Sequence, residues 1–131
     1  MKKIVLCSLA IIVSAICFSL FLQPQVELDA PTSAIARFKH NESDIESKLS
    51  TEHTKQIVGI FQGKKLRKDS PSCGFTEDVS VKIDDKTFCI ACDTCRIVYL
   101  LEDDRYFYLS DTENSFLREI LTYYGFKFPC I

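Results

Sequence analysis

Three kinds of hydrophobic pattern follow one another along the chain, and the first is an uninterrupted apolar run. Ile4–Leu22 contains no charged side chain and follows directly on Lys2 and Lys3. As a helix, at about 1.5 Å per residue, this run would be roughly 28 Å long, close to the hydrocarbon thickness of a bilayer. Residues 1–22 are therefore predicted to form a hydrophobic helix that acts as a signal peptide or a signal-anchor transmembrane helix.

The second pattern is a helical spacing of apolar residues, and it occurs twice. Lys48–Phe61 and Tyr108–Leu121 each begin near a Leu-Ser pair, continue through an acidic residue and then become amphipathic. The two segments resemble each other, so they are interpreted either as a repeated strand-into-helix unit or as two unrelated helices. Their apolar stripes are Ile57, Ile60 and Phe61 in the first, and Phe116, Leu117, Ile120, Leu121 and Tyr124 in the second.

Both helices carry sequence signals at their ends. Ser110 and Glu113 have the Ser-x-x-Glu spacing of a capping box, and Ser50 or Thr51 is expected to cap the first helix. Each stripe is followed by a glycine, Gly63 or Gly125, which is typical of the residue after a helix.

The third pattern is alternation with a period of two. Val79, Val81 and Ile83 alternate with polar residues, which is typical of a half-buried strand. Acidic turns at 84–86 and 102–104 separate further β-forming stretches. The predicted strands are Val79–Ile83, Thr87–Cys92, Arg96–Leu101 and 105–109, with a short edge strand near Ala34–Lys39 or Ile45–Leu49. The fold class is therefore α+β: a small antiparallel β-meander of about four strands packed with two amphipathic helices.

Composition and charge narrow the function classes. The chain has 131 residues, enough for one ordinary domain. Without Lys2 and Lys3, fourteen basic residues face eighteen acidic ones, so the rest of the chain is acidic and nucleic acid is not an expected partner. Residues 23–33 contain two prolines and few apolar residues and are predicted to be a linker. Residues 34–131 are predicted to be the exported, cysteine-containing domain.

The apolar run has three alternative fates. In a cleaved signal peptide, the small-x-small sequences at 13–15 and 34–36 are the candidate cleavage sites, although neither is well placed. A lipoprotein would be anchored through Cys17. An uncleaved anchor would keep the chain at the cell membrane through residues 4–22. In each case the lysines before the run predict that the C-terminal domain lies outside the cytoplasm.

Five of the seven cysteines lie beyond the apolar run, and three of them fall in "TFCIACDTCRIVYL". If Asp93 and Thr94 form a two-residue hairpin tip, Cys92 and Cys95 face each other and Cys89 lies opposite Val98. Small exported domains usually use such cysteines for disulfides. We therefore expect Cys73, Cys92, Cys95 and Cys130 to be the disulfide-bonded four, in a pairing that the sequence leaves open. Cys89 is then the free, buried thiol.

Two other chemistries use the same residues. Cys92-x-x-Cys95 is half of a tetrahedral zinc site, which Cys73 and Cys130 could complete. It is also the dithiol motif of thiol–disulfide oxidoreductases, but the strand pattern after Cys95 differs from the helix that lowers a thiol pKa in those enzymes. No cofactor is expected, with zinc as the alternative.

The remaining polar groups give weaker signals. His40 and His53 have no partner at ligand spacing and are predicted to face solvent. A cluster of basic residues within Gly63–Asp69 is either a solvated loop or a patch for anionic lipid or wall polymer. No catalytic residue is identified. The sequence favours a non-enzymatic binding or structural module of the cell envelope, stabilised by disulfides, whose partner is an envelope protein or an anionic polymer. The alternatives are the oxidoreductase or redox sensor and the zinc-stabilised interaction module.

Overall fold

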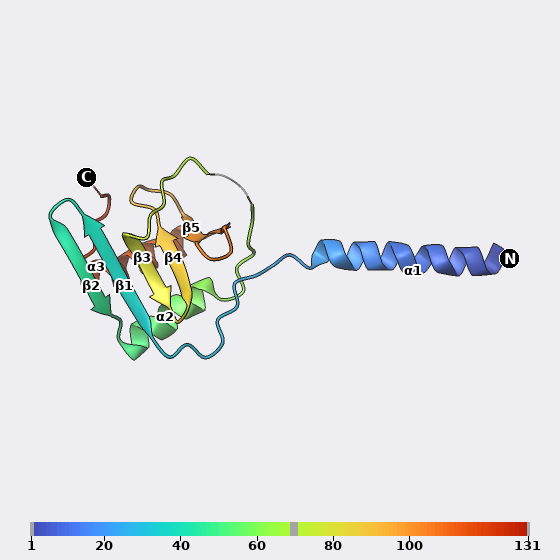
Figure 1. The fold of residues 1–131 in the computed structure, drawn as a ribbon, viewed down its shortest axis with the longest axis horizontal. Coiled ribbons are helices and arrows are strands. Elements are labelled where there is room, and N and C mark those ends of the chain that lie inside the picture. Colours follow the sequence, from blue (N-terminus) through green and yellow to red (C-terminus); the bar gives the residue numbers. More distant parts are fainter. Residues whose placement is uncertain (1, 69–70, 131) are drawn as a thin grey trace.

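The computed structural model describes residues 2–68 and 71–130. Residues 1, 69, 70 and 131 lie outside the described residues; residue 1 belongs to the predicted hydrophobic helix, Asp69 ends the predicted basic cluster, and residues 69, 70 and 131 belong to the predicted domain. The elements, shown in Figure 1, are α1 (Lys2–Phe21), β1 (Ala34–His40), β2 (Ser43–Lys48), α2 (Thr51–Phe61), β3 (Val79–Ile83), β4 (Lys86–Ile90), β5 (Ile97–Leu100), β6 (Arg105–Tyr108) and α3 (Asp111–Tyr123).

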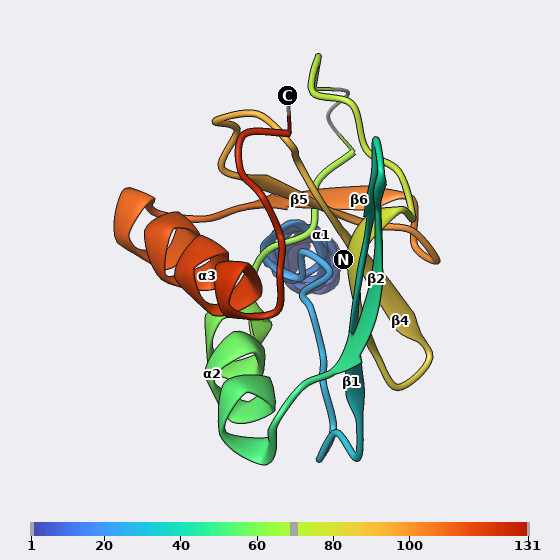
Figure 2. The same cartoon turned by 90° about the vertical axis from the view of Figure 1, so that its left-hand side faces the viewer.

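The strands form one antiparallel sheet in the order β2-β1-β3-β4-β5-β6. Figure 2 shows α2 and α3 together on one side of this sheet, which gives two layers. The α+β class and the antiparallel meander are thus confirmed, but the predicted count of about four strands is wrong. The prediction undercounted because β1 is rich in alanine and β2 is polar, so neither stretch resembles a typical strand.

The core lies between the sheet and the two helices. Phe38, Val81 and Phe88 point from the strands to this side, and Phe61 and Leu117 meet them from the helices. Phe61 lies against Phe88 with ring centroids 4.8 Å apart and against Phe107 at 5.2 Å. The buried stripes of the helices are Ile57, Ile60 and Phe61 in α2, and Leu117, Ile120 and Leu121 in α3. Phe116, predicted to share the second stripe, is 39% exposed because it lies at the edge of the buried face.

The predicted helix signals are present. The Ser110 side chain accepts a hydrogen bond from the Glu113 backbone N–H, and the Glu113 side chain accepts one from the Ser110 N–H. Ser50, rather than Thr51, caps α2. Gly63 and Gly125 follow the helices with positive φ angles of 76° and 97°. The unit of a strand leading through Leu-Ser into a helix therefore occurs twice, as β2–α2 and β6–α3.

A loop covers the face of β5 and β6 that the helices leave open. Phe75 lies over Tyr99 and Tyr106, with centroid separations of 5.8 and 5.6 Å. Cys89 points to this face, where it is only 1% exposed. The apolar residues on both faces of the last two strands are explained by this second cover.

The predicted linker comprises residues 23–33, and from Pro24 onward it runs along the domain in close contact with it. Val26 is 1% exposed, and its backbone N–H and C=O bond to Lys64 and Gly63. Before this segment, α1 projects from the domain (Figure 1), and its large apolar side chains between Ile4 and Phe18 are exposed. Among the described residues, no helix combines the length and the apolarity that crossing a membrane requires.

Candidate binding site and its disulfide frame

Two disulfides converge on the loop between β4 and β5. Cys73 is bonded to Cys95, and Cys92 is bonded to Cys130. The first bond fastens the loop that covers β5 and β6, and the second fastens the C-terminal segment. These are the four cysteines singled out in the sequence, and Cys89 is the free one within the domain.

The local geometry around Cys92 and Cys95 differs from the prediction of a tight hairpin. β4 ends at Ile90, β5 begins at Ile97, and Ile90 rather than Cys89 lies opposite Val98. Cys89 lies opposite Tyr99. The hairpin prediction is wrong because Cys92 and Cys95 bond to distant partners, which requires a wider loop.

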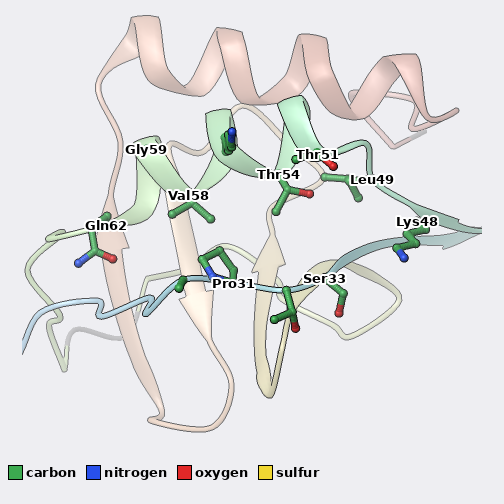
Figure 3. Close-up of a pocket in the computed structure, with 12 residues that line it drawn as sticks. Pro31, Ser33, Lys48, Leu49, Thr51, Thr54, Val58, Gly59 and Gln62 are labelled. Atoms are coloured by element: carbon green, nitrogen blue, oxygen red, sulfur yellow. The ribbon is translucent and has the colours of Figure 1, made fainter.

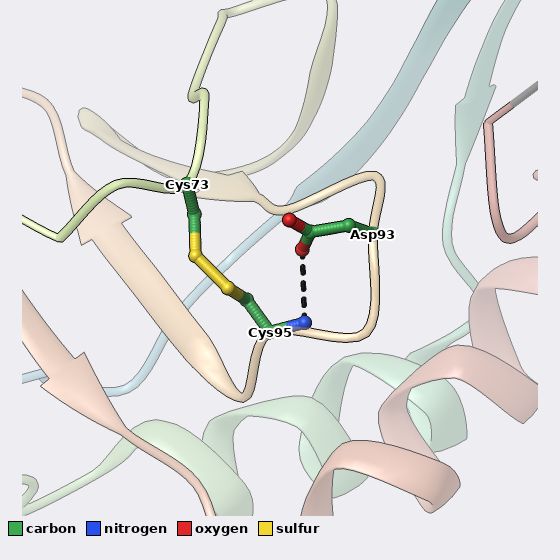
Figure 4. A group of neighbouring side chains, drawn as sticks. All are labelled: Cys73, Asp93 and Cys95. Carbon is green, nitrogen blue, oxygen red and sulfur yellow. Dashed lines mark hydrogen bonds between the residues drawn. A yellow bond between two sulfur atoms is a disulfide. The ribbon is translucent and has the colours of Figure 1, made fainter.

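Two polar side chains shape this wider loop. The Asp93 carboxylate accepts a hydrogen bond from the Cys95 backbone N–H at 2.9 Å, as Figure 4 shows. Arg118 of α3 donates to the carbonyl oxygens of Ala91 and Cys95, and its guanidinium lies 4.5 Å from the centroid of the Phe128 ring. Nothing in the sequence pattern pointed to Arg118, because its partners are backbone carbonyls far away in the chain.

The cysteine arrangement does not assemble the four-cysteine zinc site that was the alternative to disulfides. Within the described part of the chain, the one group with metal-ligating potential is Cys73, Asp93 and Cys95, and both of its sulfur atoms are used in a disulfide. Cys92 and Cys95 do not bond to each other, and Cys95 leads into β5 instead of a helix N-terminus. The disulfides thus have a structural role: they hold the covering loop and the C-terminal segment against the β4–β5 loop.

Burial also makes the free thiol inert. Burial in the sheet, aided by the negative charges of Glu77 and Glu102, raises the pKa of Cys89 to about 12. Because the thiolate is the nucleophilic form, Cys89 is not a candidate for nucleophilic chemistry at neutral pH.

A groove with a volume of about 540 Å³ lies between α2 and the extended segment that precedes β1. Such a volume and a mainly apolar lining are typical of a ligand site. Figure 3 shows Thr54 and Val58 pointing from α2 toward this segment, and Pro31 pointing back toward the helix. The lining residues are Ala30, Pro31, Thr32, Ser33, Lys48, Leu49, Thr51, Thr54, Lys55, Val58, Gly59 and Gln62.

One face of α2 forms a whole wall of this groove. Thr51, Lys55, Val58 and Gln62 follow one another at intervals of three and four residues, so they share a face beside the stripe that enters the core. Gly59 lies on the same wall, and a Cβ built there meets no heavy atom within 4 Å. The missing side chain leaves open space on this side of the helix.

Asp84, in the turn between β3 and β4, holds the opposite wall. Its Oδ1 accepts hydrogen bonds from the Thr32 N–H, the Thr32 hydroxyl and the Ser33 N–H at 3.0–3.2 Å. The Asp84 N–H donates in turn to the Ser33 carbonyl. The bond from the Thr32 hydroxyl, supported by the two N–H donors, lowers the pKa of Asp84 below its ordinary value. Residues 32 and 33 are thus fixed in place by a charged side chain.

The charged side chains that line the groove are both basic. No aspartate or glutamate lines it, whereas Lys48 and Lys55 do. The ammonium group of neither lysine has an ion-pair or hydrogen-bond partner among the described residues. Thr51 lies in the first turn of α2, where the helix dipole adds a partial positive charge.

The other predicted polar residues lie elsewhere. His53, expected to face solvent, is half-buried, and its Nδ1 lies 2.7 Å from the Tyr124 hydroxyl, so that expectation is wrong. His40 is also half-buried, near Phe38. Lys64 does not belong to a free basic patch, because it forms an ion pair with Glu113 at 2.6 Å.

Sequence reasoning missed the groove, since its walls come from a segment interpreted as a linker and from a helix face outside the apolar stripe. Gly59, a glycine within a helix, was the one sequence feature that could have indicated the groove. Comparison with protein-family models, with characterised proteins and with solved structures finds no match to this chain. The site therefore has to be interpreted from its own chemistry.

Proposed function

We propose that this protein is an exported, disulfide-stabilised binding module of the cell envelope, and that the groove between α2 and residues 30–33 is its binding site. The observation that carries the proposal is the groove itself. It combines apolar walls, two lysines whose ammonium groups have no partner among the described residues, and no lining carboxylate. Such a site suits recognition, and it lacks the paired nucleophile and base that a hydrolase or transferase needs.

Two observations support the proposed export. Disulfides form and persist in oxidising compartments, and this domain contains two. The uncharged run of α1 behind Lys2 and Lys3 has the order of an export signal. We propose that residues 4–22 direct export and bring the chain to the membrane. N-terminal sequencing of the mature protein distinguishes a cleaved signal from an uncleaved attachment.

The proposed partner is an envelope protein or an anionic envelope polymer. The two lysines of the groove supply the attraction, although the domain as a whole is acidic. An acidic surface around a positive groove disfavours non-specific adsorption of polyanions and leaves the groove as the attractive site.

A groove-filling substitution tests the proposed site. Gly59→Leu places a side chain in the open space of the groove, while Gly74→Leu is the matched control in an exposed loop, where a Cβ also meets nothing within 4 Å. Both variants and the wild type would be produced in the native host and crosslinked to their neighbours in intact cells. We expect the crosslinked species to be lost for Gly59→Leu and kept for Gly74→Leu. Equal crosslinking of the two variants would exclude the groove as the binding site.

A further inference from the structure

The geometry points to a specific class of occupant for the groove: a short, extended peptide that carries acidic side chains next to an apolar residue. This inference rests on the proposed binding function and adds the chemistry of the ligand. It follows from the distribution of charge, of apolar surface and of backbone acceptors around the groove.

Charge is concentrated at one end. Figure 3 shows Lys48 and Thr51 toward the same end of the groove, where α2 begins. Lys55 lies one helical turn after Thr51 and also lines the groove. Two ammonium groups and the first turn of a helix attract an anion. No carboxylate lines the groove, and that of Asp84 is engaged in hydrogen bonds with residues 32 and 33.

Apolar side chains line both ends of the groove: Leu49 lies at the end near Lys48, and Val58 and Pro31 lie toward the other end (Figure 3). Val58 and Pro31 face each other across the groove there, and Gly59 leaves room beside them (Figure 3). A ligand that fits both ends must carry a negative group and an apolar group a few bonds apart.

The wall formed by residues 30–33 favours a peptide over a fatty acid. The carbonyl oxygens of Ala30, Pro31 and Thr32 accept no hydrogen bond from any described residue. A peptide has backbone N–H groups to offer them, whereas a fatty acid has none. Asp84 also fixes residues 32 and 33 of this segment, which lowers the cost of ordering the segment when a peptide binds.

The experiment is a selection from a random hexapeptide library displayed on phage, with the detergent-solubilised full-length protein as the target. The same selection is run on Gly59→Leu, on the charge-reversed Lys48→Glu/Lys55→Glu variant, and on two controls. Gly74→Leu matches the first variant. Lys65→Glu/Lys127→Glu matches the second, because it changes the net charge equally at exposed positions outside this groove.

We expect wild type and both controls to enrich peptides with aspartate or glutamate near an apolar residue. Gly59→Leu should enrich none. In fluorescence anisotropy, Lys48→Glu/Lys55→Glu should bind the selected peptides about tenfold more weakly, and binding to the wild type should weaken as salt is added.

The possible failures are distinguishable. Enriched peptides that lack acidic residues but still require an open Gly59 would overturn the acidic-peptide inference and leave the binding groove in place. Enrichment that persists on Gly59→Leu would overturn both the acidic-peptide inference and the groove as the binding site. No enrichment on wild type would also overturn the inference, while the crosslinking experiment continues to test the binding function.

Discussion

At the scale of the residue, Asp84 has the clearest role, because one carboxylate oxygen fixes a wall of the groove. It receives three hydrogen bonds from Thr32 and Ser33. Its φ of +50° lies in the left-handed region, which asparagine and aspartate tolerate better than most residues. Asn is therefore the substitution that removes the charge with the least change in backbone geometry.

This role predicts a specific dependence on pH. The pKa of Asp84 is lowered on folding, so its charged form stabilises the folded state. That contribution is complete above the ordinary pKa, about 3.9, and is lost as pH falls below it through the lowered value. Between about pH 4 and pH 2, the unfolding midpoint in urea should fall more for wild type than for Asp84→Asn. Asp85→Asn, at an exposed neighbouring position, should behave as wild type; an equal acid response of all three proteins would refute the role of Asp84.

Two glycines should respond in opposite directions to the same substitution. Gly59 has ordinary helical backbone geometry and open space, so Gly59→Ala should stabilise the fold by about 0.5–1 kcal/mol. Gly125 has a φ of +97°, and a Cβ there would lie 2.7 Å from Ile45 Cδ1. Gly125→Ala should therefore destabilise the fold by about 1–2 kcal/mol. Urea unfolding measures both, and a gain in stability at Gly125 would contradict the assigned backbone geometry.

At the scale of the element, much of the fold was predictable. The helices α2 and α3 were expected because Ile57, Phe61, Leu117 and Leu121 repeat at helical spacing and serines mark both starts. The strands β3–β6 were expected from alternation. The β1–β2 hairpin was undervalued, since a strand made of Ala34, Ala36 and polar residues gains its stability from pairing with β3, which is not a local property.

The candidate site was less predictable than the fold. The four cysteines could be selected by their number and context, but their pairing depends on which loops meet in space. The groove depends on Asp84 meeting Thr32 across 52 positions of sequence, a contact that no local pattern encodes. Gly59 was visible in the sequence, although its open surroundings were not.

The disulfides give a prediction at this scale. They close loops with sequence separations of 22 and 38 residues. In the chain-entropy model, such loops correspond to about 3 and about 4 kcal/mol of stabilisation. Removing either pair, as Cys73→Ser/Cys95→Ser or Cys92→Ser/Cys130→Ser, should lower the free energy of unfolding by these amounts. Cys89→Ala, which keeps both bonds, is the control; a loss below about 1 kcal/mol for either pair would show that the bond does not stabilise the fold.

At the scale of the whole molecule, the oxidising environment can be tested by mass. Protein isolated from its native compartment under acid quench should carry both disulfides. After denaturation without reductant, segment 23–131 should take up one alkyl group, at Cys89, and after reduction it should take up five. Uptake of five groups before reduction would mean that the thiols are free in the cell, and the proposed export would fail.

The docking of residues 24–33 also limits how far the module can reach. Between the end of α1 at Phe21 and the paired Gln25 lie three residues, Leu22, Gln23 and Pro24. Fully extended, three residues span about 10 Å. Under the attachment through α1 that we propose, the groove can reach ligands only in a thin layer above the membrane surface. A ligand on a distant molecule would have to enter that layer to be bound. Inserting a flexible stretch at Gln23 would make the layer thicker.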